Sequence, residues 1–576
     1  MAIENIYDPL DAYVNEFKTR FDDVCRETFE ALAREAQVDV EANRQTCADI
    51  EANGEKLKKV RTTIGWWTAL CVALWVVTSA GAVAAVWGFA KGNPTVGVIG
   101  IAAAALGLCL LLGKVNPRLR ALKDERDNLE QTIRQLTDLA WKQMEPLNRL
   151  YDWDIFTRMM TKTVPRLEFD PFFTAQRLEE LRAVYNWDDS FNDSRSVLFS
   201  HSGLINGNPF VICRTKKMEW GKKTYEGSLD IEWTEYERDS NGKMRSVRRR
   251  QTLRASIERP IPKYFQKTRL FYGNTAAPDL TFTRRKSGLA SKQKSIGFKY
   301  KRSQLRKKMR NLKEDYAMMG NEEFEVAFDT SNRNNNQQHA LLFTPLAQNS
   351  MMSLLVDDEA GYGDDFDFEK CRMINTIITD HMQGSTLDMD PQQYRNYSFD
   401  KASEDFQSVN AAHFRAIYFA FAPLLAIPAY QQIRPHEAFY GTEMKRRSTF
   451  WEHEALANFW GAHHFEHPQC VTECILKTEI VGSPDHEATV KVHAHGYRTE
   501  ARVTYVEVRG GDGRWHDVPV HWREYLPVTG YGSFFMREDD PQLPLDAPQK
   551  ERIAHIESVM ASVGHNLYRR HISSRL

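Results

Sequence analysis

The chain contains the stretch IGWWTALCVALWVVTSAGAVAAVWGFA (residues 64–90), then KGNP (residues 91–94), then TVGVIGIAAAALGLCLLLG (residues 95–113). Neither long stretch contains Asp, Glu, Lys or Arg, and roughly 20 apolar helical residues are enough to cross a bilayer core of about 30 Å. Because lipid offers no hydrogen bonds to backbone groups, we expect two transmembrane helices that form a hairpin over residues 62–113. The alternative is a helical hairpin buried in a large soluble core.

Charged and aromatic residues around this hairpin predict its orientation. Trp66, Trp67 and Trp87 lie near the two ends of the first stretch, where amphipathic rings favour the membrane interface. The turn contains one basic residue, Lys91, whereas both flanks are basic: Lys56, Lys58, Lys59 and Arg61 before the hairpin, and Lys114, Arg118, Arg120 and Lys123 after it. Cytosolic segments carry the excess of Lys and Arg, so we expect a multi-pass membrane protein with both termini in the cytosol.

Charge and cysteine usage narrow the class of protein. The 576 residues include 76 Lys and Arg against 77 Asp and Glu, so no overall positive field points to nucleic acid as a partner. The eight cysteines are mostly scattered, and Cys71 and Cys109 lie within the apolar stretches. Such usage is typical of a reducing compartment rather than of a disulfide-bonded secreted protein.

The hairpin is flanked by two segments with helical periodicity. Residues 8–59 predict one long amphipathic helix. After the hairpin, apolar residues recur at steps of three and four, as in a short coiled coil: Leu119, Leu122, Leu129, Ile133, Leu136, Ala140, Leu147 and Leu150. We expect the two flanking helices to pair within one chain as a stalk; pairing between copies, which would make a homo-oligomer, is the alternative.

The remaining chain predicts antiparallel β structure and further helices. Residues 196–283 alternate as strands around an Asp239–Gly242 turn, residues 368–460 are mostly helical in pattern, and residues 472–535 predict strands around an Arg509–Gly513 turn. A terminal helix is expected from Pro548, with Leu567 on its apolar face. The fold class is therefore an α+β membrane protein, and the expected divisions are residues 1–61, 62–113, 114–163, 164–370, 371–545 and 546–576.

Residues 416–433 are a further apolar segment, bracketed by Arg415 and Arg434. Pro423 and Pro428 and the short length favour a buried or interfacial helix over a third transmembrane span. If this segment did cross the membrane, the C-terminal β region would lie outside the cell.

One part of the sequence resembles a known group of proteins. The segment Asn321-Glu-Glu-Phe-Glu-Val-Ala-Phe328, followed by Leu341-Leu-Phe-Thr-Pro-Leu-Ala-Gln348 and by Met351, Met352, Leu354 and Leu355, is similar to a family of uncharacterised bacterial membrane proteins. In that family a cytosolic domain of unknown function follows a two-helix transmembrane hairpin. The resemblance covers about residues 60–356 and implies a bacterial cell-membrane location with no assigned activity. Its shared positions read as core rather than catalytic, and Pro345 reads as a helix start: Phe324, Phe328, Leu341, Leu342 and Phe343.

Histidines and cysteines gather in the C-terminal third and form a candidate metal site: His453, His463, His464, His467, Cys470 and Cys474. These side chains are the usual nitrogen and sulfur ligands of zinc, and the last three are close enough in sequence to share one ion. The spacing matches no standard zinc motif, so the alternative is histidines that are exposed or hydrogen-bonded within the fold. His493 and His495 are expected to share one strand face. No other cofactor is expected.

A basic segment offers a second candidate surface: Lys299, Lys301, Arg302, Arg306, Lys307, Lys308, Arg310 and Lys313. On a helix these residues could contact anionic lipid headgroups, where each contributes about 1 kcal/mol. A solvated face, or contact with nucleic-acid phosphates, are the alternatives.

Catalytic signatures are otherwise missing from the sequence. Lys216 replaces the first glycine that a phosphate loop ending at Gly221-Lys-Lys-Thr224 would need, and no nucleophile elbow or dinucleotide fingerprint is present. We therefore expect a non-enzymatic binding or scaffold protein, anchored in the lipid bilayer and bound to a protein partner. A membrane-tethered metal-dependent enzyme using residues 453–474 and a sensor of anionic lipid surfaces are the alternatives.

Overall fold

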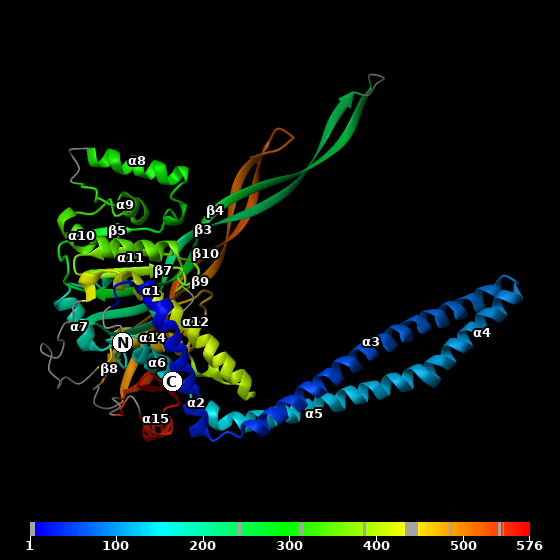
Figure 1. Ribbon diagram of the computed structural model, residues 1–576. Coiled ribbons are helices and arrows are strands. Elements are labelled where there is room, and N and C mark those ends of the chain that lie inside the picture. The colour runs from blue at the N-terminus through cyan, green and yellow to red at the C-terminus, as the bar shows by residue number, and fades with distance from the viewer. Residues whose placement is uncertain are drawn as a thin grey trace. The chain divides into compact units, whose positions relative to one another are not determined.

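The computed structural model describes residues 6–238, 243–310, 316–383, 387–431, 447–482, 487–539, 543–544 and 547–576. Its fold combines helices with antiparallel sheet, which confirms the predicted class (Figure 1). The chain divides into two compact units. The first unit comprises Met1–Cys25, Trp153–Met389 and Val409–Leu576, and the second comprises Arg26–Asp152 and Asp390–Ser408.

The second unit contains the apolar hairpin. Helix α3 (Val40–Ala90) runs through the first apolar stretch, and α4 (Pro94–Leu110) continues through η2 (Leu111–Val115) into α5 (Asn116–Asn148). The turn between α3 and α4 is made possible by Gly92, whose φ of +72° suits glycine, and by Pro94 at the first helical position. Asp39 begins α3 by accepting a hydrogen bond from the backbone N–H of Ala42.

Glycines bring α3 and α4 together backbone to backbone. A Cβ atom on Gly100 would lie 2.6 Å from the backbone nitrogen of Ala85, and one on Gly88 would lie 2.6 Å from the nitrogen of Gly97. Small residues allow this close approach, which is how apolar helices pack where no hydrophobic effect drives them together.

The outer surface of this helix pair is apolar and exposed. The exposed side chains include Trp66 at 76%, Val86 at 73% and Ile99 at 69%. Among the described residues, two helices, Val40–Ala90 and the continuous segment Pro94–Asn148, are long and apolar enough to cross a membrane. The alternative of a helical hairpin buried in a soluble core does not agree with this exposure, because the side chains of a core helix would be buried.

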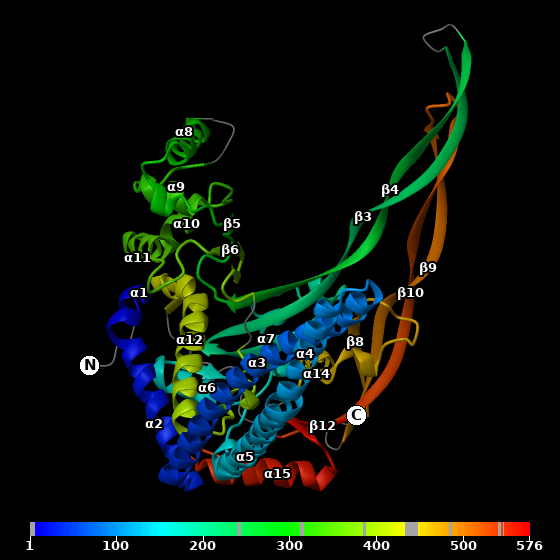
Figure 2. The same ribbon diagram turned by 90° about the vertical axis from the view of Figure 1, so that its right-hand side faces the viewer.

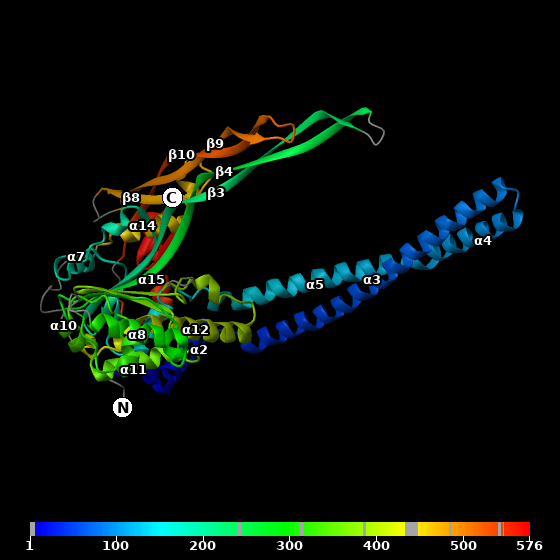
Figure 3. The same cartoon turned by 90° about the horizontal axis from the view of Figure 1, so that it is seen from above.

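The two helices that flank the hairpin pair antiparallel within the chain (Figure 3). The Asn43 amide donates a hydrogen bond to Gln143 Oε1 at 3.2 Å, and the Gln143 amide donates to Thr46 Oγ1 at 3.1 Å. Arg61 forms an ion pair with Glu130 at 2.9 Å nearer the apolar helices. The intramolecular stalk is thus confirmed, whereas these contacts do not establish a heptad coiled coil, and the homo-oligomer stays a prediction.

The single helix predicted over residues 8–59 is wrong, because the chain breaks it at residues 37–39. The helices α1 (Pro9–Ala12), η1 (Tyr13–Phe17) and α2 (Lys18–Ala36) precede a break at Gln37, whose φ is +54°. The apolar period continues across the break, so periodicity alone could not reveal it. The left-handed Gln37 and the Asp39 cap end one helix and begin the next.

The first unit contains two antiparallel sheets. Within the described residues, the first sheet has seven strands in the order β1-β2-β3-β4-β7-β6-β5. Their bounds are β1 Leu167–Phe169, β2 Arg195–Ile205, β3 Asn208–Arg238, β4 Met244–Gly273, β5 Thr281–Arg284, β6 Phe366–Cys371 and β7 Ile374–Thr379. Asn206 and Gly207, with φ of +53° and +74°, make the tight turn between β2 and β3.

The second sheet has five strands among the described parts of the chain, in the order β11-β12-β10-β9-β8. Their bounds are β8 Ile475–Val481, β9 Ala488–Arg509, β10 Trp515–Glu538, β11 Leu567–Arg569 and β12 Ile572–Arg575. Helix α14 (Phe450–Trp460) packs on β2 of the first sheet and on β8 of the second. Its Trp451 and Ala455 enter one hydrophobic cluster, and its Leu456 and Ala457 enter another.

Two long ribbons extend beyond the rest of their sheets. Strands β3 and β4 pair as far as Arg238 and Met244, and β9 and β10 pair as far as Arg509 and Trp515. The ribbons lie side by side in Figures 1, 2 and 3 and share a hydrophobic cluster that includes Ile231, Leu253 and Val518. We call residues 218–238, 243–264 and 496–534 the arm. The predicted Arg509–Gly513 turn is confirmed, whereas Asp239–Gly242 lies outside the described residues.

The remaining helices belong mainly to the first unit. They are α6 (Ile155–Thr163), α7 (Ala175–Ala183), α8 (Ile296–Arg310), α9 (Glu322–Phe328), α10 (Asn336–Leu342), α11 (Pro345–Val356), α12 (Phe399–Leu425) and α15 (Gln549–Val563). Residues 416–425 are the buried end of α12, which is not among the helices that could cross a membrane. This agrees with the prediction, made from Pro423 and Pro428, of a buried helix rather than a third transmembrane span.

Three local predictions need correction. Residues 368–460 are not mostly helical at their start, because β6 and β7 occupy residues 366–379 as a hairpin. Leu567 does not extend the terminal helix, since Gly564 ends α15 at a φ of +66° and β11 follows. Leu341 is 74% exposed and not a core residue, although its neighbours Leu342 and Phe343 are buried, because it lies on the outer side of α10. Pro345 begins α11 as predicted.

Candidate functional site

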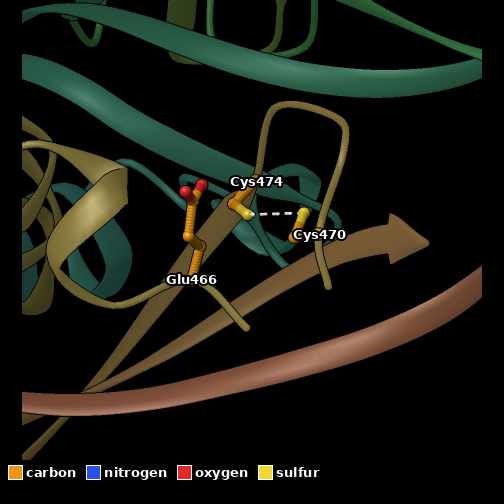
Figure 4. A group of neighbouring side chains, drawn as sticks. All are labelled: Glu466, Cys470 and Cys474. Atoms are coloured by element: carbon orange, nitrogen blue, oxygen red, sulfur yellow. Dashed lines mark hydrogen bonds between the residues drawn. The ribbon is translucent and has the colours of Figure 1, made fainter. Parts of the chain in front are cut away.

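The cysteines of the C-terminal third meet in the loop between α14 and β8. The Sγ atoms of Cys470 and Cys474 lie 3.6 Å apart. The carboxylate of Glu466 completes a group whose three ligand atoms all lie within 4.8 Å of one another (Figure 4). Cys474 is buried, Cys470 is partly buried and Glu466 is exposed, so the group opens to solvent on its carboxylate side.

Backbone hydrogen bonds hold this loop against β9. The N–H of Cys470 donates to the carbonyl of His467 at 2.8 Å, which closes a tight turn before the first cysteine. The N–H of Val471 donates to the carbonyl of Tyr497 at 2.9 Å, and the N–H of Tyr497 donates to Thr472 Oγ1 at 3.1 Å. Cys474 then leads directly into β8, so its position follows from the sheet register.

Glycines make room for the loop and for the two sulfur atoms. A Cβ atom on Gly496 would lie 2.4 Å from Cys470 Sγ and 3.0 Å from Cys474 Sγ. A Cβ atom on Gly530 of β10 would lie 2.4 Å from the carbonyl carbon of Glu466. Any larger residue at either strand position would push the loop and its cysteines outward.

The surroundings of the pair keep the Cys474 thiol protonated at neutral pH. Burial is the main cause that raises the pKa of the Cys474 thiol to about 12, and the neighbouring Cys470 adds to the effect. Lys216, which lies 3.3 Å from Glu473, lowers this pKa in part. Cys474 is therefore a poor nucleophile at neutral pH, since the thiolate is the reactive form.

The four predicted histidines do not join the cysteine group among the described residues. His453 lies inside α14, where its Nε2 is 3.0 Å from Ser448 Oγ, and burial lowers its pKa to about 4. His463 and His464 are exposed, with ring centroids 4.0 Å apart. His467 accepts a hydrogen bond at Nδ1 from the N–H of Gln469. Sequence reasoning missed Glu466, which no metal motif marks.

His493 and His495 share one face of β9, as the alternation of a strand predicts. Their ring centroids lie 6.5 Å apart, and the ring of His493 also packs edge-on against Tyr531. The His495 Nδ1 is 3.2 Å from Thr529 Oγ1 on the paired strand.

Several basic side chains of α8 form ion pairs or hydrogen bonds with nearby residues. Lys301 pairs with Asp329 at 2.6 Å, Arg306 pairs with Glu322 at 2.7 Å, and the Lys308 ammonium donates to the carbonyl of Ser331. Arg302 lies 3.8 Å from the same Glu322.

The other predicted basic residues that the structure describes lie on the solvent-exposed side of α8. Lys299, Lys307 and Arg310 are exposed, together with Ile296 and Tyr300. Lys313 lies outside the described residues. The predicted lipid contact stays a prediction, and it now rests on this smaller set.

A buried ionic network was not visible from the sequence. Arg570 Nε lies 3.2 Å from Asp388, and Arg570 Nη2 lies 2.6 Å from Glu452. Arg569 Nη2 adds a second cation 2.8 Å from Asp388. Arg569 and Arg570 lie at the β11–β12 turn, far from both acids in sequence, so only tertiary packing brings these charges together.

A surface cavity of about 590 Å³ lies beside η1 and α12 in the first unit. Its lining includes Tyr13, Asp22, Asp357 and Arg415. The Arg415 guanidinium donates hydrogen bonds to the carbonyls of Glu359, Ala360 and Gly361. It therefore holds this acidic loop in place, and its hydrogen-bond donors are not all available to a ligand in the cavity.

Comparison with known proteins gives no assignment. No family model, no curated protein and no solved structure matches this chain. The resemblance to uncharacterised bacterial membrane proteins therefore stays a prediction, and the structure supports only its coarser part, the two long apolar helices.

Proposed function

We propose that this chain is a non-enzymatic binding or scaffold protein, anchored in a bacterial cell membrane by the α3–α4 hairpin and facing the cytosol with both termini. The main support for the membrane anchor is the exposed apolar surface around the helix pair. Exposing so many apolar side chains to water is unfavourable, whereas contact with lipid is not. The basic flanks of the hairpin support the orientation. The bacterial source rests on the resemblance of residues 60–356.

The arm supports a binding role. A two-stranded ribbon is at best marginally stable in water by itself, and here two ribbons are packed together. Gly227 of one ribbon lies so close to the Pro519 carbonyl of the other that a Cβ atom would be 2.1 Å away. The arm still exposes large aromatic side chains, including Trp220, Tyr505 and Trp515. Exposed tyrosine and tryptophan are typical of surfaces that bind proteins.

Cysteine labelling in intact cells tests the anchor. We expect Asn93→Cys, in a chain that also carries Cys371→Ser, to react with a membrane-impermeant maleimide from outside. The native Cys371, which is exposed in the first unit, should react only after lysis. Reaction of Cys371 in intact cells, or recovery of unmodified protein without detergent, would rule out the proposed topology.

Quantitative affinity purification from the native host tests the arm. We expect the double variant Trp220→Ala/Trp515→Ala to lose most of the partner recovered with the unchanged chain, because both side chains are exposed and removing them spares the folded core. Tyr300→Ala, which removes an exposed aromatic from α8, is the matched control and should retain the partner. Equal recovery with the arm variant would show that the arm is not the binding surface.

A further inference from the structure

The spacing of Cys470 and Cys474 matches two ligands of one metal ion. In a tetrahedral zinc site each Zn–S bond is about 2.3 Å, which places two ligand sulfurs roughly 3.8 Å apart. The two Sγ atoms are 3.6 Å apart, and the Glu466 carboxylate lies within the same 4.8 Å group. From this geometry we infer that Glu466, Cys470 and Cys474 bind a zinc ion. Zinc binding at this loop requires neither the membrane anchor nor partner binding by the arm.

The chemistry of the donors favours zinc over harder cations. Thiolates select zinc and other soft metals, whereas magnesium and calcium require oxygen ligands. Two thiolates and one carboxylate would carry three negative charges against the two positive charges of the ion.

The loop is shaped around the sulfurs by a second, independent feature. Gly496 leaves the space that both Sγ atoms occupy, and Gly530 lets the backbone of Glu466 lie directly on β10. Cys470 Sγ also lies 3.3 Å from the carbonyl of Thr472, to which its thiol donates a hydrogen bond. Binding of zinc would release the thiol protons, and three protein ligands leave one tetrahedral position for water or another ligand.

Zinc titration of the full-length protein, purified in detergent under reducing conditions, tests this site. Competition with a chromophoric chelator should give one equivalent of tightly bound Zn²⁺. Replacement by Co²⁺ should give a thiolate-to-cobalt charge-transfer band in the near ultraviolet. We expect Cys470→Ser and Cys474→Ser each to weaken zinc binding by roughly 100-fold or more, beyond the ~10–100-fold effect of a supporting residue. Both serine variants should also lose the cobalt band.

Further variants separate a metal site from a folding defect. Glu466→Gln changes an exposed side chain, so it should retain the fold and the cobalt–sulfur band while zinc binds about 10-fold more weakly. Cys371→Ser and His467→Gln, which change residues outside the group, should bind zinc as the unchanged chain does. Unaltered zinc affinity in either Cys470→Ser or Cys474→Ser would overturn the inference. The inference would also be overturned if Cys470 and Cys474 formed a disulfide and the protein still bound no zinc after that disulfide was reduced.

Discussion

Arg570→Met is expected to lower the melting temperature of the full-length protein by on the order of 10 °C. The guanidinium is 2% exposed and lies between Asp388 and Glu452, which are also buried. Removing one partner of a buried ion pair leaves the other charge without compensation, which costs about 3–5 kcal/mol. Among the described residues, Glu452 would keep its hydrogen bonds from Ser200 Oγ and the N–H of Phe173.

Thermal unfolding in detergent measures this effect, with Arg575→Met as the matched control. Arg575 lies on the same short hairpin and pairs with Glu487 at 3.1 Å, but both side chains are partly exposed. Exposed pairs contribute about 0–1 kcal/mol, so the control should shift the transition by only a few degrees. The second change Glu452→Gln should restore part of the stability lost in Arg570→Met. Equal shifts for Arg570→Met and Arg575→Met would contradict the assigned role of the network.

Acidification from pH 7 to pH 4 is expected to destabilise the first unit, and His453 is one cause. Burial lowers the pKa of His453 to about 4 from its ordinary value of 6.5, so the folded chain holds this ring neutral. Below about pH 6.5 the unfolded chain gains a proton that the folded chain does not bind. The stability contributed by the neutral ring is therefore complete above pH 6.5, falls as the pH decreases and levels off below about pH 4.

The size of this effect follows from the pKa difference. A shift from 6.5 to about 4 corresponds to roughly 3 kcal/mol at the acidic limit. Nearby Glu452 favours the protonated ring and reduces the shift. His413, whose pKa is also lowered to about 4 by burial, acts in the same direction.

Melting curves between pH 4 and pH 7.5 test the assignment. His453→Gln keeps an N–H that can donate to Ser448 Oγ but cannot titrate, so its stability should fall less steeply with acid than that of the unchanged chain. His521→Gln, which changes a ring exposed on β10, is the matched control and should leave the slope unaltered. Parallel pH profiles for His453→Gln and the unchanged protein would refute the role of His453.

The sequence was sufficient where the structure follows from local periodicity. The apolar stretches, the Pro345 helix start, the Arg509–Gly513 turn and the alternating strands each depend on neighbouring residues along one element. The pairing of the two flanking helices also followed, because a tight turn brings the helices on either side of it together. The cysteine pair was predicted to be close for a similar reason, since only three residues separate its members.

The sequence was not sufficient where distant segments meet. Glu466 joins the cysteines because Gly530 and Gly496 admit the loop, and neither glycine is near the loop in the chain. Leu341 is exposed although Leu342 and Phe343 after it are buried, because helix packing and not hydrophobicity decides which side is covered.

By itself the sequence determined the apolar helix pair, its stalk and the strand-rich character of the larger unit, since backbone hydrogen bonding and side-chain period act over a few residues. Only the tertiary structure decided the stacking of two ribbons into the arm and the burial of Arg570 between two acids. Those features depend on contacts across long loops, whose partners no local pattern specifies.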